Sequence, residues 1–97
     1  MRVLKRATLQ AFYEKHPNAK SPLLAWYEAA KKADWHNFAA VKKTFNSVDY
    51  VGNQRYVFNI KGNDYRLVVV IQYNHSTVYI RFVGTHAEYD KIDCTTI

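Results

Sequence analysis

The chain has 97 residues, 48% of them hydrophobic, which is enough apolar material for one folded core. Fourteen lysines and arginines against eight acids give a formal charge of +6, which favours an acidic partner or a polyanion; charge that serves solubility alone is the alternative. A single cysteine, Cys94, excludes a disulfide framework and a thiolate zinc site. No leader-like apolar segment and no run of membrane-spanning length occurs, so we expect one soluble, cytoplasmic domain over residues 1–97.

The first half of the sequence has the period of amphipathic helices. Apolar residues between positions 9 and 13 recur at helical spacing and stop before Pro17, because the residue before a proline avoids the helical region. Ser21 and Pro22 are typical of an N-cap and the first helical position, and an apolar stripe follows them to Ala30. A shorter amphipathic piece over positions 38–45 predicts one or two further helical turns.

From position 55 onward the apolar period becomes two, as in strands. RYVFNIK, Gly62-Asn63 and DYRLVVVIQY predict a hairpin, because glycine first in a two-residue loop suits a type II′ turn. This turn sets a register in which Asn59 lies opposite Arg66 and Phe58 opposite Leu67. After a short polar loop, VYIRFV predicts a third strand beside the hairpin.

Strand alternation gives this sheet two different faces. One face is nearly all apolar and must pack on the helices; it is made of Tyr56, Phe58, Ile60, Tyr65, Leu67, Val69, Ile71, Tyr73, Val78, Ile80 and Phe82. The other, which we call the basic face, is made of Arg55, Val57, Asn59, Lys61, Arg66, Val68, Val70, Gln72, Tyr79, Arg81 and Val83. Its four cations predict contact with a phosphate backbone, with ordinary solvated cations as the alternative. Its candidate RNA contacts are Arg55, Asn59, Lys61 and Tyr79.

The stretch after the last strand combines a helix start with titratable side chains. Thr85 and Glu88 have the spacing of a capping box. His86, Tyr89 and Asp90 would then lie on one side of a short helix. If that helix folds back over the basic face, an imidazole and a phenol meet two guanidinium groups, which suits RNA cleavage by the substrate's own 2′-OH. We expect no metal, because alternate residues of one helical turn point apart.

Two segments of the sequence resemble a known family. YVFNIKGNDYRLVVVIQYN followed by VYIRFVGTHAEYDKID looks like the HigB family of bacterial type II toxins, within the RelE-like superfamily of ribosome-dependent mRNA interferases. AWYEAAKKADW followed by VKKTF resembles the helical half of the same family, so that the resemblance covers essentially the whole chain. It implies an α+β fold in which two N-terminal helices pack on one face of a small antiparallel sheet, with a short C-terminal helical turn. Messenger RNA would lie on the other face.

The resemblance also implies a function and its residues. It implies that the chain is a ribosome-dependent mRNA endoribonuclease that needs no metal or other cofactor. The enzyme would act in the ribosomal A site, beside 16S rRNA. A HigA-like helix-turn-helix antitoxin is the implied protein partner, and no membrane partner is implied. The catalytic positions would be Arg66, Arg81, His86 and Tyr89, with Asp90 and Lys91 as further RNA contacts. The division of labour between His86 and Tyr89 stays open, and a non-catalytic module that binds RNA or an antitoxin is the alternative function.

Overall fold

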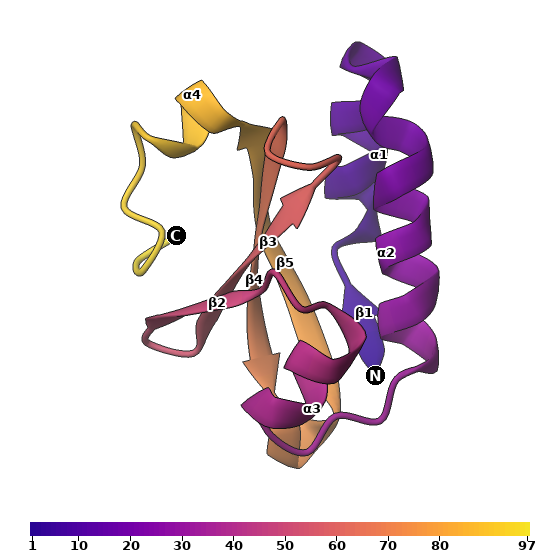
Figure 1. Cartoon of the computed structure of the whole chain (residues 1–97), viewed down its shortest axis with the longest axis vertical. Helices are drawn as coiled ribbons and strands as arrows, with labels where there is room; N and C mark the ends of the chain where they lie inside the picture. The colour runs from indigo at the N-terminus through magenta and orange to yellow at the C-terminus, as the bar shows by residue number, and fades with distance from the viewer.

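The fold is α+β, as predicted, and is described by a computed structural model of residues 1–97 (Figure 1). Helices α1 and α2 lie side by side on one face of a five-stranded sheet, and α4 lies on the other side of it (Figure 1). In chain order the elements are β1 (Arg2–Leu4), α1 (Arg6–Lys15), a 3-10 turn (Pro17–Ala19), α2 (Lys20–Lys32), α3 (Phe38–Thr44), β2 (Asp49–Gly52), β3 (Arg55–Ile60), β4 (Tyr65–Gln72), a second 3-10 turn (Tyr73–His75), β5 (Thr77–Thr85) and α4 (His86–Tyr89).

The sheet has more strands than the sequence predicted, and one pairing is parallel. The strand order is β1-β5-β4-β3-β2, with β1 parallel to β5 and all other neighbours antiparallel. The predicted antiparallel sheet is therefore the centre of a mixed one. β1 spans three residues and β2 spans four, which is too short for a period of two to be visible in the sequence.

Helix α1 ends before Pro17 as predicted, but α2 begins earlier than predicted. The 3-10 turn runs directly into α2, whose N-cap is Ala19, so Ser21 and Pro22 lie inside the first helical turn. Proline is tolerated there because the first four N–H groups of a helix have no partner within it. The longest helix has 13 residues, and none of the helices combines the length and hydropathy needed to cross a bilayer.

The hairpin between β3 and β4 has the predicted register. Asn59 pairs with Arg66 and Phe58 with Leu67. Strand pairing ends at Ile60 opposite Tyr65, so the loop is longer than the predicted two residues. Within it the Asp64 N–H donates to the Lys61 carbonyl at 3.2 Å, and both Lys61 and Gly62 have a positive φ, of +52° and +65°. One core fills the space between this sheet and the helices; its fully buried side chains include Leu9, Leu23, Trp35, Val41, Phe58, Leu67, Val69, Ile71 and Val78.

A bulge at Arg81 changes the parity of β5. Val69 pairs with Ile80 and Val68 with Phe82, which leaves Arg81 as an extra residue on β5. The predicted faces of the next two residues are therefore wrong. Phe82 lies on the basic face opposite Val68, whereas Val83 pairs with Leu67 and packs against the core.

The chain after α4 returns across the basic face of the sheet (Figure 1). The Arg55 guanidinium donates to the Ile97 backbone oxygen from Nε at 3.1 Å and from a terminal nitrogen at 2.5 Å, and Asn53 Nδ2 donates to the Thr95 carbonyl at 2.8 Å. Val57 and Val68 on this face are buried. The basic face is thus partly covered by residues 91–97, which we call the C-terminal segment.

Candidate active site

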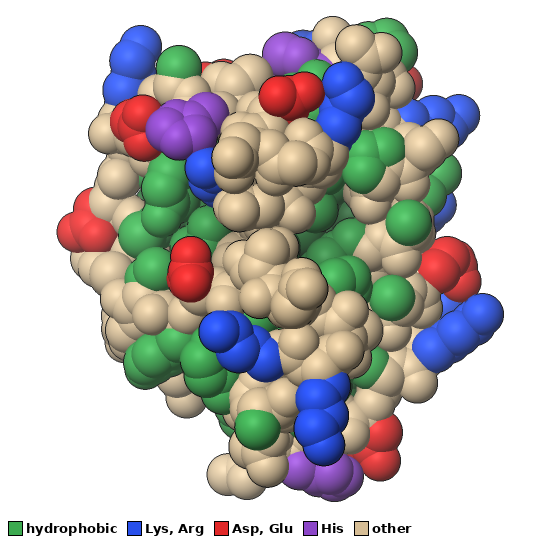
Figure 2. All heavy atoms as spheres, viewed as in Figure 1, with side chains coloured by type: hydrophobic (Ala, Val, Ile, Leu, Met, Phe, Trp, Pro, Cys, Tyr) green, Lys and Arg blue, Asp and Glu red, His purple; other side chains and the backbone are tan.

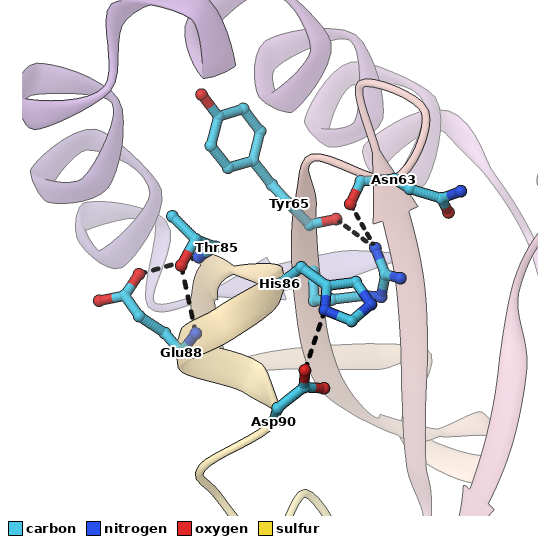
Figure 3. A network of polar contacts seen from close by, with 7 residues as sticks. Asn63, Tyr65, Thr85, His86, Glu88 and Asp90 are labelled. Atoms are coloured by element: carbon cyan, nitrogen blue, oxygen red, sulfur yellow. Dashed lines mark hydrogen bonds and ion pairs between the residues drawn. The ribbon is translucent and has the colours of Figure 1, made fainter.

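Helix α4 begins with the predicted capping box. The Glu88 N–H donates to Thr85 Oγ1 at 3.2 Å, and the Thr85 N–H donates to Glu88 Oε1 at 2.8 Å (Figure 3). The Thr85 backbone N–H also lowers the pKa of Glu88 below its usual range. A further bond from the His86 N–H to the Asp64 carbonyl, at 3.3 Å, fixes the start of α4 against the tip of the β3–β4 hairpin.

The side chains of His86 and Asp90 face each other along α4. His86 Nδ1 lies 3.1 Å from Asp90 Oδ2, and both side chains are more than half exposed (Figure 3). An exposed pair of this kind adds roughly 0–1 kcal/mol to stability. Its chemical effect is on orientation, because an Nδ1 proton donated to Asp90 leaves Nε2 free to accept a proton from a substrate.

Arg66 lies at the same corner of the sheet. It pairs with Gly84, two residues before His86, and its guanidinium donates to the Asn63 and Tyr65 carbonyls at 3.0 and 3.3 Å (Figure 3). A guanidinium has five N–H donors, so these two bonds orient it and leave others for an anion.

The hydroxyl of Tyr89 faces the C-terminal segment. It donates to Cys94 Sγ at 3.4 Å. Burial and this bond raise the pKa of Tyr89 to about 12, although the nearby Arg66 guanidinium acts in the opposite direction. The phenol is therefore protonated at neutral pH.

Arg66 and Arg81 lie on the same face of the sheet, which confirms the predicted arrangement, but in separate parts of it. Arg81 is exposed, makes no ion pair within the chain, and lines a hollow of about 290 Å³ together with Arg55 and Tyr79. Arg66 lies near α4, closer to the hairpin tip. The structure therefore groups the candidate residues as an α4 corner (Arg66, His86, Tyr89, Asp90) and a bulge region (Arg55, Tyr79, Arg81).

The remaining predicted contacts lie around the α4 corner. Lys61 Nζ lies 3.3 Å from Asp64 Oδ2, and Asn59 Nδ2 donates to Asn63 Oδ1 at 3.3 Å, so both belong to the hairpin tip. Lys91 is exposed just after α4. Figure 2, in the same view as Figure 1, shows cations that are separated from one another and interleaved with acids over the surface. No three His, Cys, Asp or Glu side chains converge as a metal-ligand set would.

The sequence pattern misplaces Phe82 and misses the role of Gly84. Strand alternation predicts Phe82 in the core, but it lies half-buried on the basic face, with its ring directed toward Gly84. A Cβ at position 84 would lie 2.5 Å from Phe82 Cζ and 3.2 Å from Glu88 Cβ, so only glycine fits between the ring and α4. The signal was Gly84 itself, because glycine inside a strand pattern marks a bulge or a close approach.

Comparison with known proteins identifies the family. A family model described as HigB toxin, the RelE-like toxic component of a toxin-antitoxin system, matches residues 19–92. The mRNA interferase toxin HigB of Escherichia coli K12 is 33% identical over 93 residues, which span 93% of this chain and 88% of the relative. The mRNA interferase HigB of Escherichia coli O6:H1 is 26% identical over 94 residues, 95% of this chain and 91% of the relative. The chain belongs to the HigB toxin family.

Membership in the HigB family confirms the resemblance inferred from the sequence motifs. The matched stretch runs from the start of α2 to just beyond α4, so it contains the whole α4 corner and all three arginines of the basic face. As the toxic component of a toxin-antitoxin system, a HigB toxin has an antitoxin as its partner.

Proposed function

We propose that this HigB toxin is an mRNA interferase that cuts messages in the A site of translating ribosomes, beside 16S rRNA. The observation that carries this function is the His86–Asp90 pair, 3.1 Å apart, at the same corner of a basic sheet face as Arg66. The relatives named mRNA interferases support it. Ribosome dependence places the activity in the cytoplasm, and residues 1–97 act as one toxin domain.

The chemistry follows from the α4 corner. Asp90 holds the His86 Nδ1 proton, and Nε2 takes the proton of the substrate's 2′-OH. The 2′-oxygen attacks the adjacent phosphorus as the bond to the 5′-oxygen breaks, and that oxygen leaves with a proton from water. The products are a 2′,3′-cyclic phosphate and a 5′-OH. Arg66 stabilises the charge that develops on the phosphate oxygens.

The other candidate residues bind the RNA around this centre. Arg81 contacts a phosphate on the basic face, and Tyr79 contacts the RNA beside it. Arg55 binds the Ile97 backbone oxygen, so it contacts a phosphate only when the RNA displaces the end of the C-terminal segment. The RNA strand near the α4 corner contacts Asn59, Lys61 and Lys91. Tyr89 positions a base, because its protonated phenol is a poor proton acceptor at neutral pH.

Cleavage on ribosomes programmed with a synthetic message tests the reaction. A 2′-deoxy nucleotide at the cleaved position should abolish cutting because the nucleophile is missing, whereas 2′-deoxy substitution at the 3′ neighbour should leave cutting intact. End analysis should find the cyclic phosphate. Cutting that survives the first substitution, or RNA binding without any cutting, would contradict the proposal.

Two further experiments address the metal and the partner. Sulfur in place of a non-bridging oxygen of the scissile phosphate should slow cutting without rescue by a thiophilic cation, because arginine and not a metal contacts that oxygen. Rescue would indicate a metal ligand. Co-expression with the neighbouring gene, which we propose encodes a HigA-like helix-turn-helix antitoxin, should restore the growth that the toxin alone arrests.

A further inference from the structure

The end of the sheet farthest from α4 carries a second hollow, of about 280 Å³, beside the 3-10 turn after β4. Its walls combine flat aromatic rings with amide groups: Tyr50, Tyr56 and Tyr73, and Gln54, Gln72 and Asn74. We propose that this hollow holds one unpaired nucleobase of the RNA substrate. The inference rests on the proposed function, since it extends the path of the same RNA strand.

The aromatic wall is built to offer a ring face. Tyr50 is 51% exposed, the only large hydrophobic side chain exposed to this extent. Its ring centroid lies 5.1 Å from that of Tyr56 and 6.4 Å from that of Phe38, so the Tyr50 ring packs against both. The Tyr73 hydroxyl donates to the Tyr56 hydroxyl at 2.8 Å, which fixes the floor. Bases of single-stranded RNA stack on exposed rings of this kind.

The amide groups supply the hydrogen bonds that a base edge needs. The side-chain amides of Gln54, Gln72 and Asn74 line the hollow and form no hydrogen bond with another protein group. An amide side chain offers a donor and an acceptor side by side, which is the pattern that reads a base edge. The hollow therefore pairs a stacking surface with edge-reading groups.

The backbone at Gln54 points to a use for its side chain. Asn53 and Gln54 are the two central residues of the β2–β3 turn, with φ values of +51° and +63°, between the paired residues Gly52 and Arg55. Such a turn strongly favours glycine at the second position. Glutamine there is strained, and strain of this kind is retained where the side chain has a function.

The rings of this hollow belong to the helix-facing side of the sheet, and the hollow meets the basic face only at the β2–β3 turn and the end of β4. Gln54 and Gln72 line both this hollow and the neighbouring one that contains Arg55 and Arg81. An RNA strand with a base in the tyrosine-lined hollow would therefore pass around this end of the sheet and place its adjoining phosphates near these arginines. Asp49, beside Tyr50, is an acid at this end, and Lys42, whose Nζ lies 5.9 Å from the Phe38 ring centroid, is a cation there.

Affinity for a short single-stranded RNA tests the assignment, with all proteins carrying His86→Ala so that the RNA is not consumed. Tyr50→Ala and Gln54→Gly should each raise Kd about tenfold, while Tyr50→Phe keeps the ring and the affinity. Asn53→Gly is the matched control, because it changes the other left-handed residue of the turn, whose amide contacts Thr95 outside the hollow. Gln54→Gly should unfold at the same temperature as its parent or higher, which separates lost binding from misfolding.

A scan with a single abasic nucleotide identifies the contact as a base contact. One position should weaken binding of the parent about tenfold and have no further effect in Tyr50→Ala. Equal affinity of all variants, together with intact ribosomal cleavage by the wild-type protein, would overturn the nucleobase site and leave the proposed function standing. Loss of antitoxin affinity without loss of RNA affinity would overturn it in favour of a protein-docking surface. A wild-type protein that does not cut messages on ribosomes would contradict the proposed function itself.

Discussion

Tyr89→Phe removes one hydroxyl from the α4 corner and keeps the ring. That hydroxyl donates to Cys94 Sγ, and the pKa of Tyr89 is raised to about 12. At pH 7 a phenol with this pKa is ionised in about one molecule in 10⁵, against about one in 10³ at the reference value of about 10. The ionised form of Tyr89, which is the form that could accept a proton, is therefore about a hundredfold rarer than that of an ordinary tyrosine. We expect Tyr89→Phe to cut RNA within about threefold of the wild-type rate.

His86→Ala should behave differently, because histidine is the side chain that exchanges protons near neutral pH. We expect a fall of roughly 10² to 10⁴ in the single-turnover rate on programmed ribosomes. No fall of this size should occur in Tyr89→Phe.

A matched control is Tyr27→Phe, which removes a hydroxyl from α2 on the opposite side of the sheet. It should cut at the wild-type rate. A loss of rate in Tyr89→Phe as large as that in His86→Ala, at an unchanged unfolding temperature, would show that the hydroxyl takes part in the chemistry.

Three other substitutions have outcomes fixed by specific contacts. Arg66→Lys keeps the charge but loses the planar fork, so the cleavage rate should fall about tenfold or more without a change in unfolding temperature; a near-normal rate would show that charge alone suffices. Gly84→Ala places a Cβ 2.5 Å from Phe82 Cζ and should cost about 1–2 kcal/mol in urea unfolding. Adding Phe82→Leu should recover part of this loss, and no recovery would mean that the ring is not the obstacle. Thr85→Ala should destabilise the start of α4 by about 1 kcal/mol, seen as faster hydrogen exchange at the Glu88 N–H; unchanged exchange would contradict the capping box.

The features that were predictable from the sequence are those coded by neighbouring residues. Gly62 determines the turn, and the turn determines the register from Asn59 opposite Arg66 down the hairpin. The capping box is likewise a pattern of four consecutive positions, beginning at Thr85. In both cases the interacting groups lie within a few residues of one another, so the local sequence is sufficient.

The features that were not predictable depend on residues far apart in the chain. Phe82 and Val83 are both apolar, so hydropathy does not show which of them faces the core, and the extra residue at Arg81 shows only when β5 is paired with β4. The C-terminal segment has no period of its own, and its place depends on bonds from Asn53 and Arg55. The grouping of the candidate residues into two regions was therefore beyond local patterns.

The parallel pairing of β1 with β5 has a consequence for the order in which the chain can fold. Residues 2–4 pair with residues 77–79, so the first strand to be synthesised cannot join the sheet until the last strand has been synthesised. During synthesis α1 and α2 emerge before the sheet that buries their apolar sides. β5 lies between β1 and β4 and is followed directly by His86. β5 thus joins β1 to the other three strands and leads directly into α4. A nascent chain therefore cannot complete its candidate active site before it has completed its fold.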